Sequence, residues 1–293
     1  MRKLSLLLPF LLAWAGCREP ADVVLPKGDA DLALEALAMP DADYAAVSLD
    51  SAGVLPGDQF RFPGSLTIVR VTHDDGQTVR MGAFSRVLFE NRSREIRYLG
   101  KRYGFHGIDL GELRLNGTPM ARLPHRIRIR RSPAPDSLLV GGVEYLADLR
   151  NVYRPRALYT WAADSPDSLS PFEVSIGSPD ELAVLSPAGG SIVERNRPLP
   201  LRWTGSGPML LVVSGFDPAT REVRPLFRAF SAQGGGSALL ASRFLRLLPL
   251  ERFRYYVFTF LLLNRDESFS VGGFEGRILV QAASVYNSYV ELR

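Results

Sequence analysis

The sequence is poor in the residues from which most metal and redox sites are built. Its 293 residues include one cysteine and three histidines. One cysteine excludes an intrachain disulfide and a cysteine-based zinc site, and three histidines leave little material for a histidine-rich metal centre. Lysine is also scarce, since only 3 of the 35 basic residues are lysines. No apolar run reaches the roughly 20 residues that a membrane-spanning helix needs.

The remaining composition is that of a folded globular chain. Hydrophobic residues make up 46% of the sequence and charged residues 23%, which is the balance of a protein with a packed core rather than of a disordered one. The glycine run Gly234-Gly235-Gly236 is followed by no G-K-[ST], so it is not a phosphate-binding loop. No G-x-S-x-G elbow of a serine hydrolase is present. We therefore expect no catalytic residues, no cofactor and no metal ligands.

The amino terminus carries the sharpest signal. Residues 1–17 read MRKLSLLLPFLLAWAGC, with the positive pair Arg2 and Lys3 followed by the apolar stretch Leu4 to Ala15. Twelve apolar residues are too few to cross a bilayer as a helix. A positive start, an apolar stretch and small residues at its end are typical of a secretory signal peptide.

The residues Ala15-Gly16-Cys17 resemble the end of a bacterial lipoprotein signal peptide. This resemblance implies that residues 1–16 are removed, that the Cys17 thiol receives a diacylglycerol and that the new amino group is acylated. The chain departs from the family at Trp14, where leucine is usual. Arg18 after the cysteine, in place of aspartate, implies the outer membrane of a Gram-negative cell. An ordinary secretory signal that happens to end near a cysteine is the alternative.

Removal of the signal peptide changes the charge of the chain. Arg2 and Lys3 account for two of the four net positive charges, so the processed chain carries a net charge of only +2. This small excess gives little support to nucleic-acid binding, and export makes such binding less plausible still. The predicted partners are therefore the membrane, through the lipid on Cys17, together with other envelope proteins or glycans, and not a nucleic acid.

The sequence predicts an all-β fold in two domains after a tether. Residues 17–58 form the tether, with a short helix between residues 29 and 40. Residues 59–178 alternate with period two and form an antiparallel β domain. Asp75-Gly76 and Asn116-Gly117 mark hairpin turns in it, and a further hairpin is expected around Asn91. Residues 144–153 are ambiguous, because their apolar spacing also fits a short helix.

Residues 179–293 are typical of a seven-stranded sandwich. Strand-like runs are found at 182–185, 199–203, 209–213, 226–230, 239–247, 255–263 and 278–284. The runs Leu201-Arg202-Trp203, Leu248-Pro249 and Tyr255-Tyr256-Val257 resemble the fibronectin type III module. The resemblance implies that Trp203 packs in the core of an immunoglobulin-like sandwich and that the later strand carries a buried tyrosine.

The strongest candidate for binding is a row of arginines. Residues 125–130 read HRIRIR, which places Arg126, Arg128 and Arg130 on one face of a strand and the isoleucines on the other. Such a face can bind an acidic glycan or a lipid phosphate through bidentate hydrogen bonds, although a solvated β face that discourages aggregation is the simpler interpretation. His73 is expected in a turn, His106 in a structural role and His125 at a polar strand edge.

These patterns favour a lipid-anchored envelope protein with a non-catalytic binding or scaffold role. Two alternatives remain. One is an enzyme that acts on an envelope polymer with a site assembled from scattered residues of the first domain. The other is a carbohydrate-binding or anionic-lipid-binding module that uses the arginine face.

Overall fold

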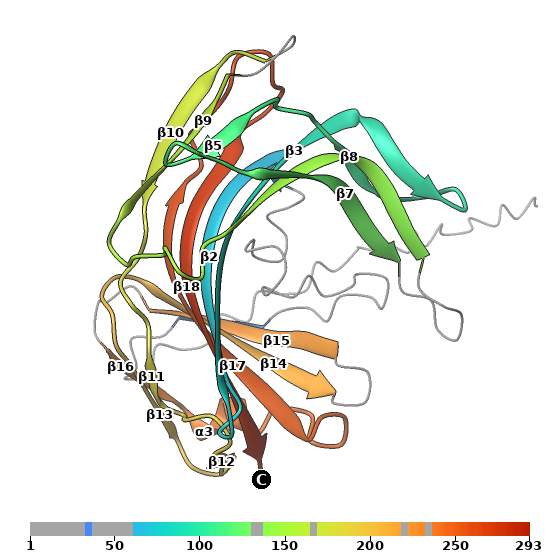
Figure 1. Ribbon diagram of the computed structural model, residues 1–293. Coiled ribbons are helices and arrows are strands. Elements are labelled where there is room, and N and C mark those ends of the chain that lie inside the picture. Colours follow the sequence, from blue (N-terminus) through green and yellow to red (C-terminus); the bar gives the residue numbers. More distant parts are fainter. Residues whose placement is uncertain (1–32, 37–60, 130–136, 165–168, 218–221, 232–235) are drawn as a thin grey trace, which may run out of the picture.

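The fold of the described residues is almost entirely β. The computed structural model describes residues 33–36, 61–129, 137–164, 169–217, 222–231 and 236–293. Within these ranges it contains eighteen strands and one short helix, α3 (Ser242–Leu245). The strands form one large sheet and two small ones, and Figure 1 shows the large sheet as a curved band that runs the length of the molecule. The predicted all-β class is confirmed.

The large sheet joins both halves of the sequence. Its path is β1 (Ala33–Ala36), β15 (Glu222–Ser231), β14 (Met209–Asp217), β17 (Tyr255–Asp266), β18 (Ile278–Leu292), β2 (Gly64–Asp74), β3 (Val79–Tyr98), β4 (Lys101–Gly107), β8 (Ser137–Asp148) and β7 (Ala121–Ile129). Neighbours are antiparallel except at β18–β2 and at the short β4–β8 contact, which are parallel. The domain boundary predicted at 178/179 falls between two strands, but the β18–β2 pairing continues the sheet across the two regions.

The second half of the chain forms an immunoglobulin-like sandwich. A three-stranded sheet of β11 (Val184–Ser186), β13 (Leu199–Trp203) and β16 (Ser237–Leu240) packs on β15, β14, β17 and β18. Three strands thus face four, which makes the seven-stranded sandwich that the sequence predicted. Trp203 and Tyr256 are buried in the shared core, and the rings of Trp203 and Phe260 lie 6.2 Å apart. The short strand β12 (Ile192–Val193) pairs in parallel with the end of β18.

The first half of the chain has a core of its own, which we call the first core. The small sheet β10 (Phe172–Gly177), β9 (Leu158–Ala163), β5 (Leu113–Leu115) and β6 (Thr118–Pro119) covers β2, β3 and β8 there. Trp161 is fully buried in this core, and its indole nitrogen donates a 3.1 Å hydrogen bond to Ser85 Oγ. A buried indole N–H needs such a partner.

Strand β18 contributes to both cores. Because side chains alternate along a strand, Ile278, Val280 and Ala282 enter the first core, and Tyr286 and Val290 on the same face enter the sandwich core. Both small sheets therefore lie on one side of the large sheet (Figure 1). On its other side lies a third buried cluster, which contains Val69, Val71, Val212, Leu261, Ala283 and Val285. One strand thus fixes the position of the two small sheets relative to each other.

Several local predictions are confirmed. The turn at Asp75-Gly76 joins β2 to β3, and Gly76 has a φ of 81°. Asn116-Gly117 joins β5 to β6 in the same way, with both residues at positive φ. Asp75 Oδ1 accepts the N–H groups of Gln77 and Thr78, so the aspartate side chain closes its own turn.

Three local predictions are wrong, and one segment that the sequence left ambiguous is resolved. Residues 33–36 of the helix expected over 29–40 form strand β1, because they pair with β15. The ambiguous segment 144–153 consists of the end of β8 and a single turn, in which the N–H of Tyr153 donates to the carbonyl of Leu149 at 2.8 Å. The chain does not turn at Asn91, since β3 runs on to Tyr98. The strand expected over 239–247 ends at Leu240, and α3 follows.

Candidate functional site

The terminal hairpin of the large sheet carries the arginine face. In β7, Arg126 lies directly opposite Val140 of β8, and Arg128 opposite Leu138. Arg126 is exposed, while Leu138 and Val140 are 55% and 59% exposed. Directly paired residues of an antiparallel ladder share a face. The outer face of this hairpin therefore combines the exposed guanidinium of Arg126 with two uncovered aliphatic side chains.

The alternation predicted for this strand is confirmed where it is described. Ile129 is buried and Ile127 approaches Gly104 of β4, so the isoleucines pack inward and Arg126 points outward. Of the other two predicted site residues, Arg128 has its backbone in β7 but its side chain is not described, and Arg130 lies outside the described residues. We refer to Arg126, Leu138 and Val140 as the hairpin face.

Nearby arginines differ from Arg126 because they form ion pairs with carboxylates. Arg97 and Arg102 both pair with Glu95, at 2.5 and 3.4 Å. Arg122 pairs with Asp109 through two nitrogens. Among the described residues, no carboxylate bonds to Arg126. Arg97, Arg102 and Arg122 thus differ from Arg126 in having a carboxylate partner among the described residues.

A buried charge cluster lies at the base of the same hairpin. Arg86 of β3 donates from Nε and Nη2 to Oε2 of Glu144 at 2.9 and 2.7 Å. His125, only 5% exposed, has Nδ1 at 3.6 Å from the same oxygen. Burial would raise the pKa of Glu144, but His125 and Arg86 outweigh it, so this pKa lies below its usual value. The expectation that His125 is a polar edge residue is wrong: it lies on an edge strand but is buried.

Glu90 of β3 behaves in the opposite way. Burial raises its pKa, and the nearby side chains of His125, Arg92 and Arg86 offset this effect only in part. A carboxyl group in such surroundings favours its neutral form. The cluster therefore holds one carboxylate that stays ionised and one that takes up a proton more readily.

The other histidines do not join this cluster. His73 lies in β2 rather than in a turn, so that expectation is wrong, and its Nδ1 is 3.3 Å from both Asn287 Nδ2 and Tyr289 Oη. His106 lies in β4, close to Gly141. In the described part of the chain, no three His, Cys, Asp or Glu side chains are grouped so as to hold a metal ion. Cys17 lies outside the described residues.

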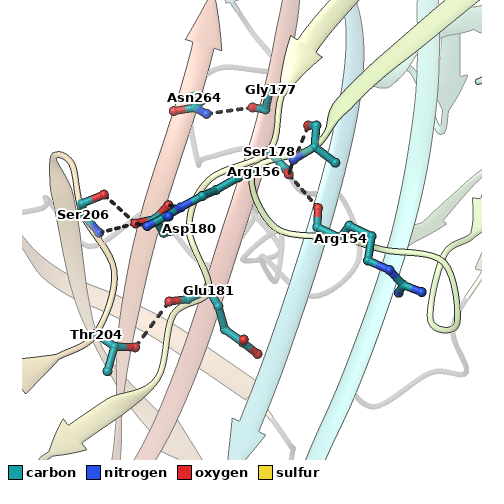
Figure 2. Close-up of polar contacts among 10 residues, drawn as sticks. Arg154, Arg156, Gly177, Ser178, Asp180, Glu181, Thr204, Ser206 and Asn264 are labelled. Atoms are coloured by element: carbon teal, nitrogen blue, oxygen red, sulfur yellow. Dashed lines mark hydrogen bonds and ion pairs between the residues drawn. The ribbon is translucent and has the colours of Figure 1, made fainter.

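A second polar cluster joins the two halves of the molecule. Figure 2 shows Arg156, from the segment before β9, directed at Asp180, from the segment before β11. Arg156 Nη2 donates to Asp180 Oδ2 at 2.8 Å, and Ser206 donates to the same oxygen from its backbone N at 3.0 Å and from Oγ at 2.5 Å. These bonds hold the pKa of Asp180 far below its usual value.

Further bonds surround this pair (Figure 2). Asn264 of β17 donates from Nδ2 to the Gly177 carbonyl at 2.7 Å, and Ser178 Oγ donates to the Arg154 carbonyl at 2.8 Å. Glu181 accepts a 2.6 Å bond from Arg70 of β2. We call this set of contacts the junction. It ties the link between β10 and β11 to both halves of the molecule.

Sequence reasoning missed part of each cluster. Leu138 and Val140 matter only because of their register with the arginine strand, although the run Leu138-Leu139-Val140 before Gly141-Gly142 was a visible strand signal. Arg86 and Glu144 are 58 residues apart, and no spacing rule connects them. The same holds for the junction, because Arg156, Asp180 and Ser206 lie more than 20 residues apart from one another in the sequence.

The comparisons with known proteins add little. No family model and no curated protein matches the chain. Two solved structures of the yeast delta-COP-I mu-homology domain are similar in part: one at 9% identity with a TM-score of 0.23, the other, complexed with a Dsl1 WxWxV peptide, at 8% and 0.21. Each comparison covers 79% of this chain and 98% of the other. Likeness at this level carries no argument about function.

Proposed function

We propose that the protein is a lipid-anchored extracytoplasmic protein of the bacterial envelope with a non-catalytic binding or scaffold role. The observation that carries the proposal is the position of the only cysteine, directly after an apolar stretch and the small pair Ala15-Gly16. Lipid attached there provides about 0.8 kcal/mol per buried CH₂, and two or three chains suffice for a stable anchor. Arg18 after the cysteine favours the outer membrane as the destination.

The architecture supports the scaffold part of this proposal. Strand β18 is shared by two hydrophobic cores, and the junction ties the segment between β10 and β11 to both of them. Such a molecule presents distant surfaces in a fixed relation, which is what a scaffold requires. Across the described residues, no helix is long and apolar enough to cross a bilayer.

Lipid labelling of the intact protein tests the anchor. Cells that express the wild-type chain or Cys17→Ser are grown with a labelled fatty acid, and the mass of the mature amino terminus is determined. We expect a labelled wild type that begins at Cys17 and an unlabelled variant that is released from membranes by a salt wash. Trp14→Leu restores the usual family residue and serves as the matched control, which should be labelled like the wild type. An unlabelled wild type that retains residues 1–16 would overturn the proposal.

A further inference from the structure

We propose that the hairpin face docks on the anionic phospholipid surface of a bilayer. The inference rests on the proposed anchoring for its location, since a lipid on Cys17 keeps the folded part near a membrane. The 16 residue steps from Cys17 to Ala33 of β1 span at most about 55 Å. The membrane surface is thus within constant reach of the folded part.

The geometry of the hairpin leaves this face uncovered. The inner face of β7 is used for packing, because Ile129 is buried and Ile127 meets Gly104 of the neighbouring β4. On the outer face the exposed Val140 lies directly opposite Arg126, and Leu138 lies two residues before Val140 on the same strand. Strand β7 is also the last strand of the sheet path. The face therefore lies at one end of the sheet, where a flat surface can approach it.

The chemistry of the face matches that of a bilayer surface. A guanidinium donates to phosphate through paired N–H groups, and cations close to an anionic leaflet are attracted to it. Aliphatic side chains beside those cations can enter the boundary between headgroups and acyl chains. Arg126 has no carboxylate partner among the described residues, in contrast to Arg97, Arg102 and Arg122, so its charge is available to a phosphate.

An acidic protein surface is the competing occupant. It would satisfy Arg126, but it gives no reason for Val140, directly opposite Arg126, and the neighbouring Leu138 to stand more than half exposed. A bilayer interface takes both residue types at once, since its phosphates and acyl chains lie within a few ångströms of each other. We therefore commit to the bilayer and leave the acidic protein as an outcome of the test.

Vesicle flotation separates these outcomes. The mature chain with Cys17→Ser, which has no lipid of its own, is mixed with phosphatidylcholine vesicles that contain either no anionic lipid or about one third phosphatidylglycerol. We expect binding only to the anionic vesicles and a marked loss in 0.5 M salt, because salt screens exposed charges. Arg126→Ser should weaken binding to the anionic vesicles roughly fivefold. The double variant Leu138→Ser, Val140→Ser should weaken binding both without added salt and in 0.5 M salt.

Matched controls come from the outer face of the small sandwich sheet. Arg202→Ser on β13 and Leu185→Ser on β11 remove an exposed arginine and an exposed leucine elsewhere and should leave vesicle binding unchanged. Thermal unfolding of every variant verifies the fold. Three outcomes would overturn the inference: equal losses in the controls, no effect of the hairpin variants, or no binding of the parent chain to anionic vesicles. The third outcome would favour an acidic protein as the partner of the hairpin face.

The proposed lipid anchor and the proposed membrane docking of the hairpin face can be tested independently of each other. The vesicle experiment uses a chain without a lipid anchor, so a negative result leaves the lipid labelling of Cys17 unaffected. An unlabelled wild type, in turn, would overturn the proposed lipid anchor. It would not affect the vesicle experiment, which measures the affinity of the hairpin face itself.

Discussion

Arg156 and Asp180 face each other across the segment that links the two halves of the molecule, with Nε directed at Oδ1 and Nη2 at Oδ2. Both nitrogens of one edge of the guanidinium are used, which is the bidentate geometry that favours arginine over lysine. The backbone of Arg156 has a φ of 58°, a conformation that non-glycine residues seldom adopt. The ion pair thus coincides with an unusual backbone position and keeps the side chain turned towards the sandwich.

We expect Asp180 to make the unfolding of the protein sensitive to acid. Because its folded-state pKa lies below the ordinary 3.8, the stability that it contributes is fully present above pH 4 and is lost as the pH falls through the folded-state value. Asp180→Asn should lower the melting temperature at pH 7, and the difference from the wild type should shrink below pH 4. Thermal unfolding at pH 7, 5 and 3 measures this.

The matched control for Asp180 is Asp164→Asn. Asp164 is 78% exposed and lies 3.8 Å from Arg114, a surface contact of little energetic weight. Its substitution should leave the melting temperature unchanged at every pH. An Asp180→Asn variant as stable as Asp164→Asn would show that the junction does not stabilise the fold.

Trp161 should be the most costly side chain to truncate in the first core. It is fully buried, and Trp161→Ala is expected to lower the free energy of unfolding by about 3–5 kcal/mol. Trp161→Phe keeps an aromatic ring but leaves the buried Ser85 hydroxyl without its indole partner, at a cost of about 1–3 kcal/mol. Urea unfolding followed by circular dichroism measures both values.

Leu158→Ala on the same strand is the control for Trp161. Leu158 is exposed, so its truncation should change the free energy of unfolding by no more than about 0.5 kcal/mol. If Trp161→Ala were equally mild, the small sheet of β5, β6, β9 and β10 would not be packed on β3 as described.

The strands that the sequence predicted well are those whose signal is local. Leu199–Trp203 and the long apolar run that begins at Tyr255 are rich in β-forming residues and are bounded by turns, and both are strands in the structure. Burial of Trp203, and of a tyrosine on the later strand, was implied by the resemblance to the fibronectin type III module, and Trp203 and Tyr256 are buried. The parallel pairing of β18 with β2 joins residues more than 200 positions apart, and no local pattern encodes it.

The failures have physical causes as well. Leu146, Leu149 and Tyr153 have helical spacing, but only the turn from Leu149 to Tyr153 closes a helical hydrogen bond, while Leu146 belongs to a strand. Gly142, with a φ of 74° and in contact with Gly107, breaks the alternation of β8, so period-two counting does not carry through the strand. Arg126 was identified in advance because its face follows from alternation, whereas its aliphatic partners depend on register.

Glu90 should destabilise the protein at neutral pH. Burial raises its pKa above the usual 4.5, so the folded state holds this proton more tightly than the unfolded state does. The free energy of unfolding therefore falls as the pH rises from 4.5 through the folded-state value. Glu90→Gln keeps the shape and removes the ionisation, and it should raise the melting temperature at pH 7 while matching the wild type at pH 4. The exposed Glu173→Gln on β10 should change neither. A Glu90→Gln variant that is less stable at pH 7 would mean that the ionised carboxylate is held by the cations of the buried cluster, and that His125 and Arg86 serve Glu90 as well as Glu144.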